Sequence, residues 1–149
     1  MKKIMILCCS LCLLMTGCMR KPTTPEPSPV PTVTPSVSRL QEVMDYLDQH
    51  DIDVSDNAPV SSLDFNALEG KTFSYQDQMI YLYRFDRDNP EGKKMLDYAT
   101  ENGKMKVIID GREMEYTAYV NEDMILFYDS EEPLEALRQI YVSYPSMAE

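Results

Sequence analysis

The chain has 149 residues, and 25 acidic against 14 basic side chains give it a formal net charge of −11. Such an acidic chain is a poor partner for nucleic acids, whose phosphates are bound by clustered Lys and Arg. All four cysteines fall within the first eighteen residues, so the rest of the chain has neither a disulfide nor a cysteine-based metal site.

The N-terminal segment has the layout of a secretory signal. Lys2 and Lys3 supply a positive start, and residues 4–15 are apolar except for Ser10. A helix of that length rises about 18 Å, well short of the roughly 30 Å core of a bilayer. We therefore expect residues 1–17 to be a cleaved signal peptide and not a transmembrane helix.

The sequence Leu-Met-Thr-Gly-Cys at residues 14–18 resembles the lipobox of bacterial lipoproteins. In that family a small residue and then Gly or Ala precede the Cys. Thr16 and Gly17 fill these positions, while Met15 stands where Leu is usual. The resemblance implies cleavage between Gly17 and Cys18, lipidation of Cys18, and anchoring to the extracytoplasmic side of the cell membrane. The alternative is an ordinary secretory signal that leaves Cys18 as a free thiol.

Residues 18–38 have the composition of a tether. Six prolines lie from Pro22 to Pro35, separated mainly by Thr, Ser and Val. Proline fixes φ and removes a backbone donor, which favours extended polyproline II over helix or sheet. We expect a disordered spacer with a reach of up to about 60 Å. Residues 39–149 are then left to form a single globular domain.

The first part of this domain begins with a helix. Apolar residues at i, i+3, i+4 and i+7 predict a helix that starts after Ser38 and ends near His50. Alternation over residues 51–55 predicts a short extended piece, and a turn follows at 56–59. Residues 60–77 show no clear pattern.

Residues 79–85 form the clearest predicted strand. Apolar side chains on both of its faces indicate a central position in a sheet. A helix follows, because Asn89 is a favourable N-cap, Pro90 suits the first helical position, and Gly103 suits a C-cap.

The last part of the domain contains strands joined by turns. Three predicted strands are residues 105–109, 114–119 and 124–128. Asp110 and Gly111 fit a type I′ hairpin turn, and a final helix is expected to begin at Ser130 or Glu131. The order α-β-α-β-β-β-α predicts an α+β fold with about four strands, antiparallel or mixed, and two to three helices.

Residues 39–149 resemble small lipoproteins of Gram-positive-type bacteria. The resemblance lies in two apolar strands, 79–83 and 124–128, and in Leu134 and Leu137 after the second strand. That group has no established activity. The resemblance therefore supports the extracytoplasmic location and implies no particular chemistry.

No catalytic constellation is apparent. His50 is the only histidine, no G-x-S-x-G motif exists, and we expect His50 to be exposed at the end of a helix. We therefore predict a protein that is not an enzyme and that needs no cofactor.

An acidic segment imitates the start of a calcium loop. Asp51, Asp53 and Ser55 have the right spacing, but Asp56 stands at the glycine position and Ser62 at the position of the bidentate Glu. Asp51, Asp53 and Asp56 are thus weak metal candidates, and a solvated acidic edge is the alternative. We predict no metal.

Tyrosines are the most informative remaining feature, with ten in the chain. Tyr81, Tyr83, Tyr116 and Tyr119 are candidates for a binding face, because tyrosine is enriched at interfaces. The alternative is a partly buried sheet face under a helix.

The leading hypothesis is a lipid-anchored module that binds an envelope protein or another envelope component and does not bind nucleic acid. A small-ligand or calcium sensor using residues 45–56 is the second hypothesis, and a carboxylate-based envelope enzyme is the third.

Overall fold

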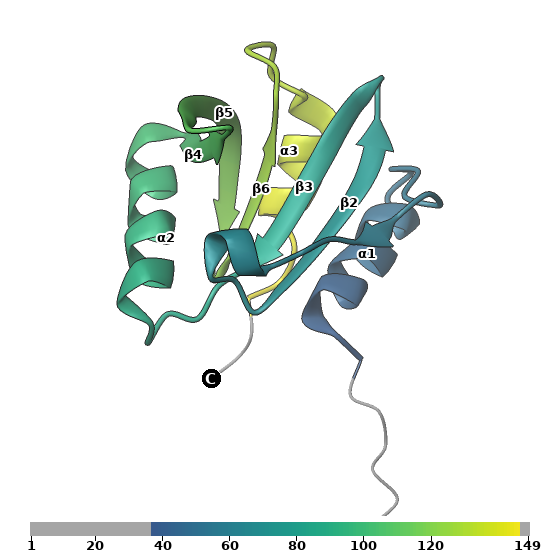
Figure 1. Ribbon diagram of the computed structural model, residues 1–149. Coiled ribbons are helices and arrows are strands. Elements are labelled where there is room, and N and C mark those ends of the chain that lie inside the picture. Colours follow the sequence, from purple (N-terminus) through teal and green to yellow (C-terminus); the bar gives the residue numbers. More distant parts are fainter. Residues whose placement is uncertain (1–36, 147–149) are drawn as a thin grey trace, which may run out of the picture. The chain divides into compact units, whose positions relative to one another are not determined.

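The computed structural model describes residues 37–146, which all belong to one compact unit, Pro35–Glu149. Figure 1 shows an α+β fold, as the sequence predicts, with three α-helices and a six-stranded sheet among the described residues. The predicted signal peptide, Cys18 and nearly all of the predicted tether lie outside the described residues.

The elements follow one another as α1 (Arg39–Gln49), β1 (Ala58–Pro59), the 3₁₀ turn η1 (Leu63–Phe65), β2 (Glu69–Tyr75), β3 (Gln78–Arg84), α2 (Pro90–Asn102), β4 (Lys104–Ile109), β5 (Arg112–Asn121), β6 (Met124–Tyr128) and α3 (Glu135–Val142). The spatial order of the strands is β1-β2-β3-β6-β5-β4. The prediction of about four strands is too low, because β1 and β2 arise from residues 56–77, where no strand was predicted.

Every neighbouring pair of strands is antiparallel. Helix α2 carries the chain from β3 to the far edge of the sheet, where β4 begins. The β4-β5-β6 meander then returns toward the centre, and β6 pairs with β3 in the opposite direction, with Tyr81 opposite Phe127. The sheet is therefore antiparallel, and the mixed alternative is wrong.

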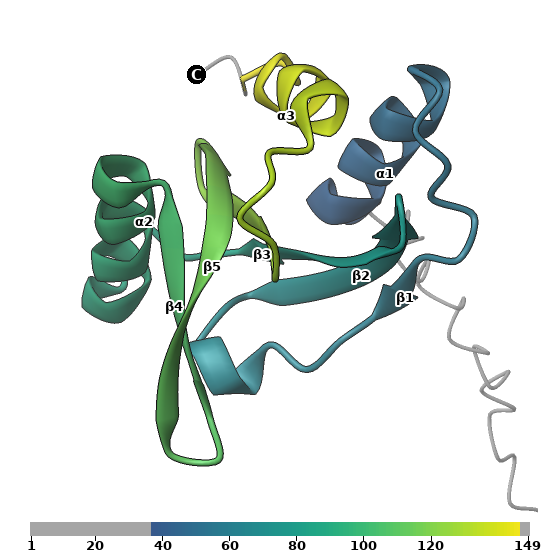
Figure 2. The ribbon, with the colours of Figure 1, turned by 90° about the horizontal axis from the view of Figure 1, so that it is seen from above.

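Side chains on the two sides of the sheet form two separate cores. Helices α1 and α3 cover one side (Figure 2), where Ile80, Leu82 and Leu126 contribute to the core. Helix α2 packs on the other side with Phe127 and Tyr83. The predicted strand over residues 79–85 is confirmed as central, because its alternate side chains enter different cores.

Local signals place most helix ends where they were predicted. Ser38 Oγ accepts the backbone N–H of Gln41, and Asn89 Oδ1 accepts that of Glu91 at 2.9 Å. Gly103 ends α2 with a φ of 61°, a conformation that glycine adopts at little cost. Asp110 and Gly111 both have positive φ, as a type I′ turn requires.

Two predicted elements differ in the structure. The last helix begins at Glu135 and not at Ser130 or Glu131, because Ser130 Oγ accepts the backbone N–H of Glu132 and the Tyr128 hydroxyl accepts that of Leu134. Residues 51–55 belong to no strand. Their apolar members nevertheless enter the core beneath α1.

A buried ion network joins the first residue of α1 to the sheet. Arg39 is 6% exposed and Asp123 is 8% exposed. Arg39 pairs with Glu122 at 2.5 Å, while Asp123 pairs with Arg84 at 2.8 Å and lies 3.6 Å from Arg39 Nε. Arg84 also pairs with Glu69 of β2 at 3.3 Å. The start of the domain is thus tied to strands β2 and β3 and to the β5–β6 turn.

Candidate functional site

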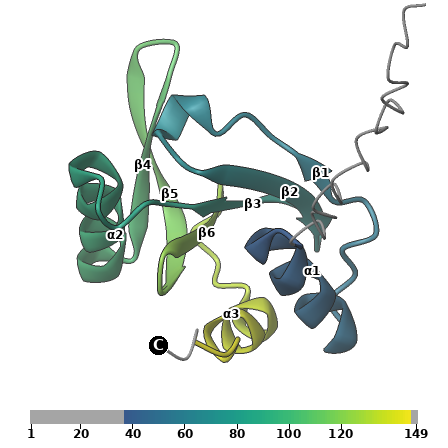
Figure 3. The same cartoon turned by 90° about the horizontal axis from the view of Figure 1, so that it is seen from below.

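A hollow of about 210 Å³ opens on the side of the sheet that α1 and α3 leave uncovered. Turn η1 lies beside the β4–β5 hairpin in both Figure 2 and Figure 3, and these two segments provide its walls. We call this hollow the aromatic pocket. Its lining residues are Asp64, Phe65, Tyr81, Tyr83, Val107, Ile108, Tyr116 and Phe127.

Phe127 is the centre of the ring arrangement. Its ring centroid lies 5.4 Å from that of Tyr81 and 5.7 Å from that of Tyr83, with interplanar angles of 20° and 12°. Tyr116 meets Phe127 edge-on at 5.9 Å. Strand alternation explains this grouping, because Tyr81 and Tyr83 share one face of β3 and Tyr81 lies opposite Phe127 on β6.

The position of Tyr83 is fixed from two directions. Its hydroxyl donates to the carbonyl oxygen of Ser61 at 3.0 Å, and its ring meets that of Phe65 at 4.8 Å. The ring also lies over Gly70, where a Cβ would come within 2.6 Å of Tyr83 Cε1. Gly70 therefore allows the close approach of this ring to the backbone of β2.

The polar groups of the aromatic pocket have spare acceptor capacity. The hydroxyls of Tyr81 and Tyr116 make no hydrogen bond with any described residue, whereas that of Tyr83 is used by Ser61. Burial and then the carboxylate of Asp64 raise the pKa of Tyr83, and burial and then Asp129 raise the pKa of Tyr116. The pocket thus combines phenol groups with the carboxylate of Asp64 in its lining, and Asp129 is close enough to Tyr116 to raise its pKa.

Tyr119 lies elsewhere. It is three residues from Tyr116 on β5, so its side chain projects to the opposite face of the sheet. There it packs against the core below α1 and α3, and its hydroxyl lies 2.9 Å from that of Tyr128. The structure therefore brings together Tyr81, Tyr83 and Tyr116 but places Tyr119 on the other side.

In the acidic segment, the carboxylates of Asp53 and Asp56 accept local hydrogen bonds from the backbone. Asp53 accepts the backbone N–H of Ser55 at 3.0 Å, and both carboxylate oxygens of Asp56 accept that of Ser74 at 3.1 Å. These hydrogen bonds lower the pKa of Asp53 and of Asp56. Asp51 has a positive φ of 63° at the end of α1. Within residues 37–146, no three His, Cys, Asp or Glu side chains converge as a metal site would need.

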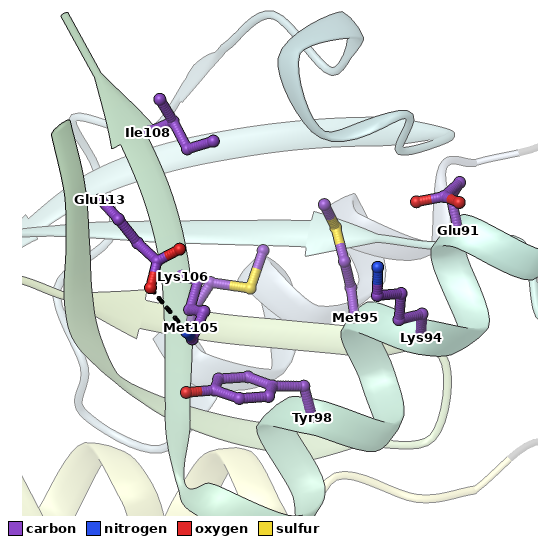
Figure 4. Close-up of a pocket in the computed structure, with 8 residues that line it drawn as sticks. All are labelled: Glu91, Lys94, Met95, Tyr98, Met105, Lys106, Ile108 and Glu113. Carbon is purple, nitrogen blue, oxygen red and sulfur yellow. Dashed lines mark hydrogen bonds and ion pairs between the residues drawn. The ribbon is translucent and has the colours of Figure 1, made fainter. Parts of the chain in front are cut away.

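A second hollow of about 290 Å³ lies between α2 and the outer strand β4 (Figure 4). Three of its polar side chains, Tyr98, Lys106 and Glu113, already have partners, whereas Glu91 and Lys94 make no ion pair with a described residue. Lys106 pairs with Glu113 at 2.6 Å and lies 5.3 Å from the centroid of the Tyr98 ring, and the Tyr98 hydroxyl donates to Glu115 at 2.7 Å. Both hollows therefore contain polar side chains without partners, and stacked aromatic rings distinguish the aromatic pocket.

His50 is the C-cap of α1 and is exposed, with Nδ1 2.8 Å from the carbonyl oxygen of Tyr46. No helix within residues 37–146 has both the length and the apolar character to cross a membrane. Comparisons with protein-family models, curated proteins and solved structures found no match for this chain.

Proposed function

We propose that this chain is a bacterial lipoprotein, anchored through Cys18 on the extracytoplasmic side of the cell membrane, whose domain binds an envelope protein. The anchor is supported by the order of charge, apolar run, small residues and Cys in residues 2–18. Two or more acyl chains at Cys18 give stable attachment, which a single chain does not.

The observation that carries the binding function is the aromatic pocket. Its tyrosines supply a large apolar surface, and the hydroxyls of Tyr81 and Tyr116 have no partner among the described residues. Apolar side chains flank it: Leu63 of η1 is 83% exposed and Ile108 of β4 is 73% exposed. An aromatic centre with exposed apolar flanks is typical of a surface that another protein covers.

The anchor is tested by fatty-acid labelling. Cells expressing the wild-type chain are expected to incorporate radiolabelled palmitate into it and to retain it in the membrane fraction. Cys18→Ser is expected to lose the label, because the thiol is the site of diacylglycerol attachment. A labelled Cys18→Ser protein, or an unlabelled wild type, would contradict the lipoprotein proposal.

The binding function is tested by cross-linking the full chain in intact cells and identifying captured proteins by mass spectrometry. A partner is expected with wild type and with Tyr98→Leu, whose tyrosine lies outside the aromatic pocket. Tyr81→Leu is expected to lose that partner while its circular dichroism spectrum stays unchanged. Equal capture of the partner by wild type and Tyr81→Leu would show that the aromatic pocket is not the binding site.

A further inference from the structure

We propose that the aromatic pocket receives the guanidinium group of an arginine side chain from the partner protein. The inference rests on the proposed binding function and specifies the chemistry of the group that enters. It follows from the size of the pocket, the arrangement of its rings and the groups at its rim.

Size favours one side chain over a whole small-molecule ligand. The pocket holds about 210 Å³, whereas sites for drug-sized ligands hold roughly 300–1,000 Å³. A single long side chain that enters from a flat partner surface suits this volume. Arginine is also among the residues most often found as energetic anchors of protein interfaces.

The rings favour a planar cation. The rings of Tyr81 and Tyr83, which line the pocket, stack against Phe127 with interplanar angles of 20° and 12°. The faces of aromatic rings carry negative electrostatic potential and attract cations, and guanidinium is found there more often than ammonium. A guanidinium can also stack flat on such a ring, which a tetrahedral ammonium cannot do.

The polar groups favour a donor-only partner. The hydroxyls of Tyr81 and Tyr116 have free acceptor capacity, and Asp64 and Asp129 make no ion pair with any described residue. A guanidinium carries donors and no acceptor, so it matches both kinds of oxygen.

The described part of the chain supplies no cation to this place. No Lys or Arg is among the residues that line the aromatic pocket. By contrast, the hollow beside α2 contains Lys106, which already lies over the ring of Tyr98. The net charge of −11 also favours encounter with a basic partner surface.

The test uses the full chain in a non-ionic detergent, with ¹³C-labelled tyrosine, and follows the ring signals by NMR. The probes are N-acetyl-arginine methylamide, its neutral isostere N-acetyl-citrulline methylamide, and the corresponding lysine derivative. The arginine probe is expected to shift the signals of Tyr81 and Tyr116 and to bind about tenfold more tightly than citrulline. Equal binding of the citrulline probe would overturn the proposal, as would tighter binding of the lysine probe.

Variants locate the interaction. Tyr81→Leu is expected to abolish binding of the arginine probe, and the pair Asp64→Asn and Asp129→Asn to weaken it severalfold. Tyr98→Leu is the matched control and should bind normally. Loss of binding with Tyr98→Leu and not with Tyr81→Leu would place the cation in the hollow beside α2 and overturn the assignment.

The two proposals fail separately. If Tyr81→Leu loses the cross-linked partner but wild type binds no arginine probe, the proposed binding function is retained and the proposal of a guanidinium ligand is refuted. If the arginine probe binds at Tyr81 but Tyr81→Leu keeps every cross-linked partner, the pocket recognises guanidinium without serving the proposed interface.

Discussion

Two buried tyrosines provide a matched pair of substitutions with opposite expected effects on stability. Tyr128 and Tyr141 are both fully buried beneath α1 and α3. Replacing either with Phe removes one oxygen and leaves the ring in place. Tyr128→Phe is expected to destabilise the fold, whereas Tyr141→Phe is expected to leave stability unchanged or to raise it.

The difference lies in the hydrogen bonds of the two hydroxyls. That of Tyr128 accepts the backbone N–H of Leu134 at 3.0 Å and lies 2.9 Å from the hydroxyl of Tyr119. Removing it leaves these part-buried groups without a hydrogen-bond partner, at a cost of about 1–3 kcal/mol. The Tyr141 hydroxyl has no hydrogen-bond partner among the described residues; the backbone N–H of Asn121 is near but outside hydrogen-bond geometry. Its removal abolishes a desolvation penalty of similar size.

Thermal unfolding of the full chain, followed by circular dichroism, measures both effects. Each kcal/mol corresponds to a shift in Tm of about 4–8 °C for a domain of this size. Tyr128→Phe should therefore melt clearly below wild type, and Tyr141→Phe at or above it. If Tyr141→Phe lost as much stability as Tyr128→Phe, its hydroxyl would have to be hydrogen-bonded in solution, and the reasoning would be refuted.

Three further substitutions or titrations test other contacts. Gly92→Ala should lower the free energy of unfolding by about 1–3 kcal/mol despite the better helix propensity of Ala, because its Cβ would lie 2.5 Å from the carbonyl oxygen of Asp86; a higher Tm would contradict this. Burial raises the pKa of Tyr119, so its stabilising contribution is present below about pH 10 and is lost above it; the ¹³C ring signal of Tyr119 should show ionisation only together with unfolding, and ionisation of this residue without any loss of structure would count against burial. The N–H of Ser74 lowers the pKa of Asp56 below its ordinary 3.8, so that contribution is present above this value and is lost as the pH falls below it; Asp56→Asn should flatten the acid side of the stability profile, and an unchanged profile would refute the link.

The elements that were predicted correctly from the sequence are those marked by local signals. Asn89, Pro90 and Gly103 mark both ends of α2, and Asp110-Gly111 marks the β4–β5 turn. Each signal acts within a few residues, through a cap or a backbone conformation, so no tertiary information is needed to recognise it.

Strand β2 was missed because its turn carries no such signal. Gln76 and Asp77 both adopt positive φ in the β2–β3 hairpin, with values of 49° and 62°. Glycine or asparagine would normally indicate this conformation, so the pairing of the two strands must impose it on these residues. Pro59 likewise gave no indication of β1, because a two-residue edge strand is defined only by its partner.

The candidate site was predictable only in part, for a similar reason. Alternation along one strand places Tyr81 and Tyr83 together, and the structure does the same. Tyr116 and Tyr119 were grouped although an odd spacing on a strand puts them on opposite faces. Phe65 comes from a segment without a pattern, and only the register between β3 and β6 brings Phe127 to the centre. Such contacts depend on residues far apart in the sequence.

The buried ion network around Arg39 has a mechanical consequence for a tethered protein. In the proposed lipoprotein, any pull between membrane and partner enters the domain at Ser38 and Arg39. Arg39 is held there by Glu122 and Asp123, at the turn between β5 and β6. Force on the tether is therefore transferred to the middle of the sheet at the first residue of α1, and the helix itself does not carry the load. The ion pairs of Arg39 therefore lie at the point where a pull on the tether would enter the domain.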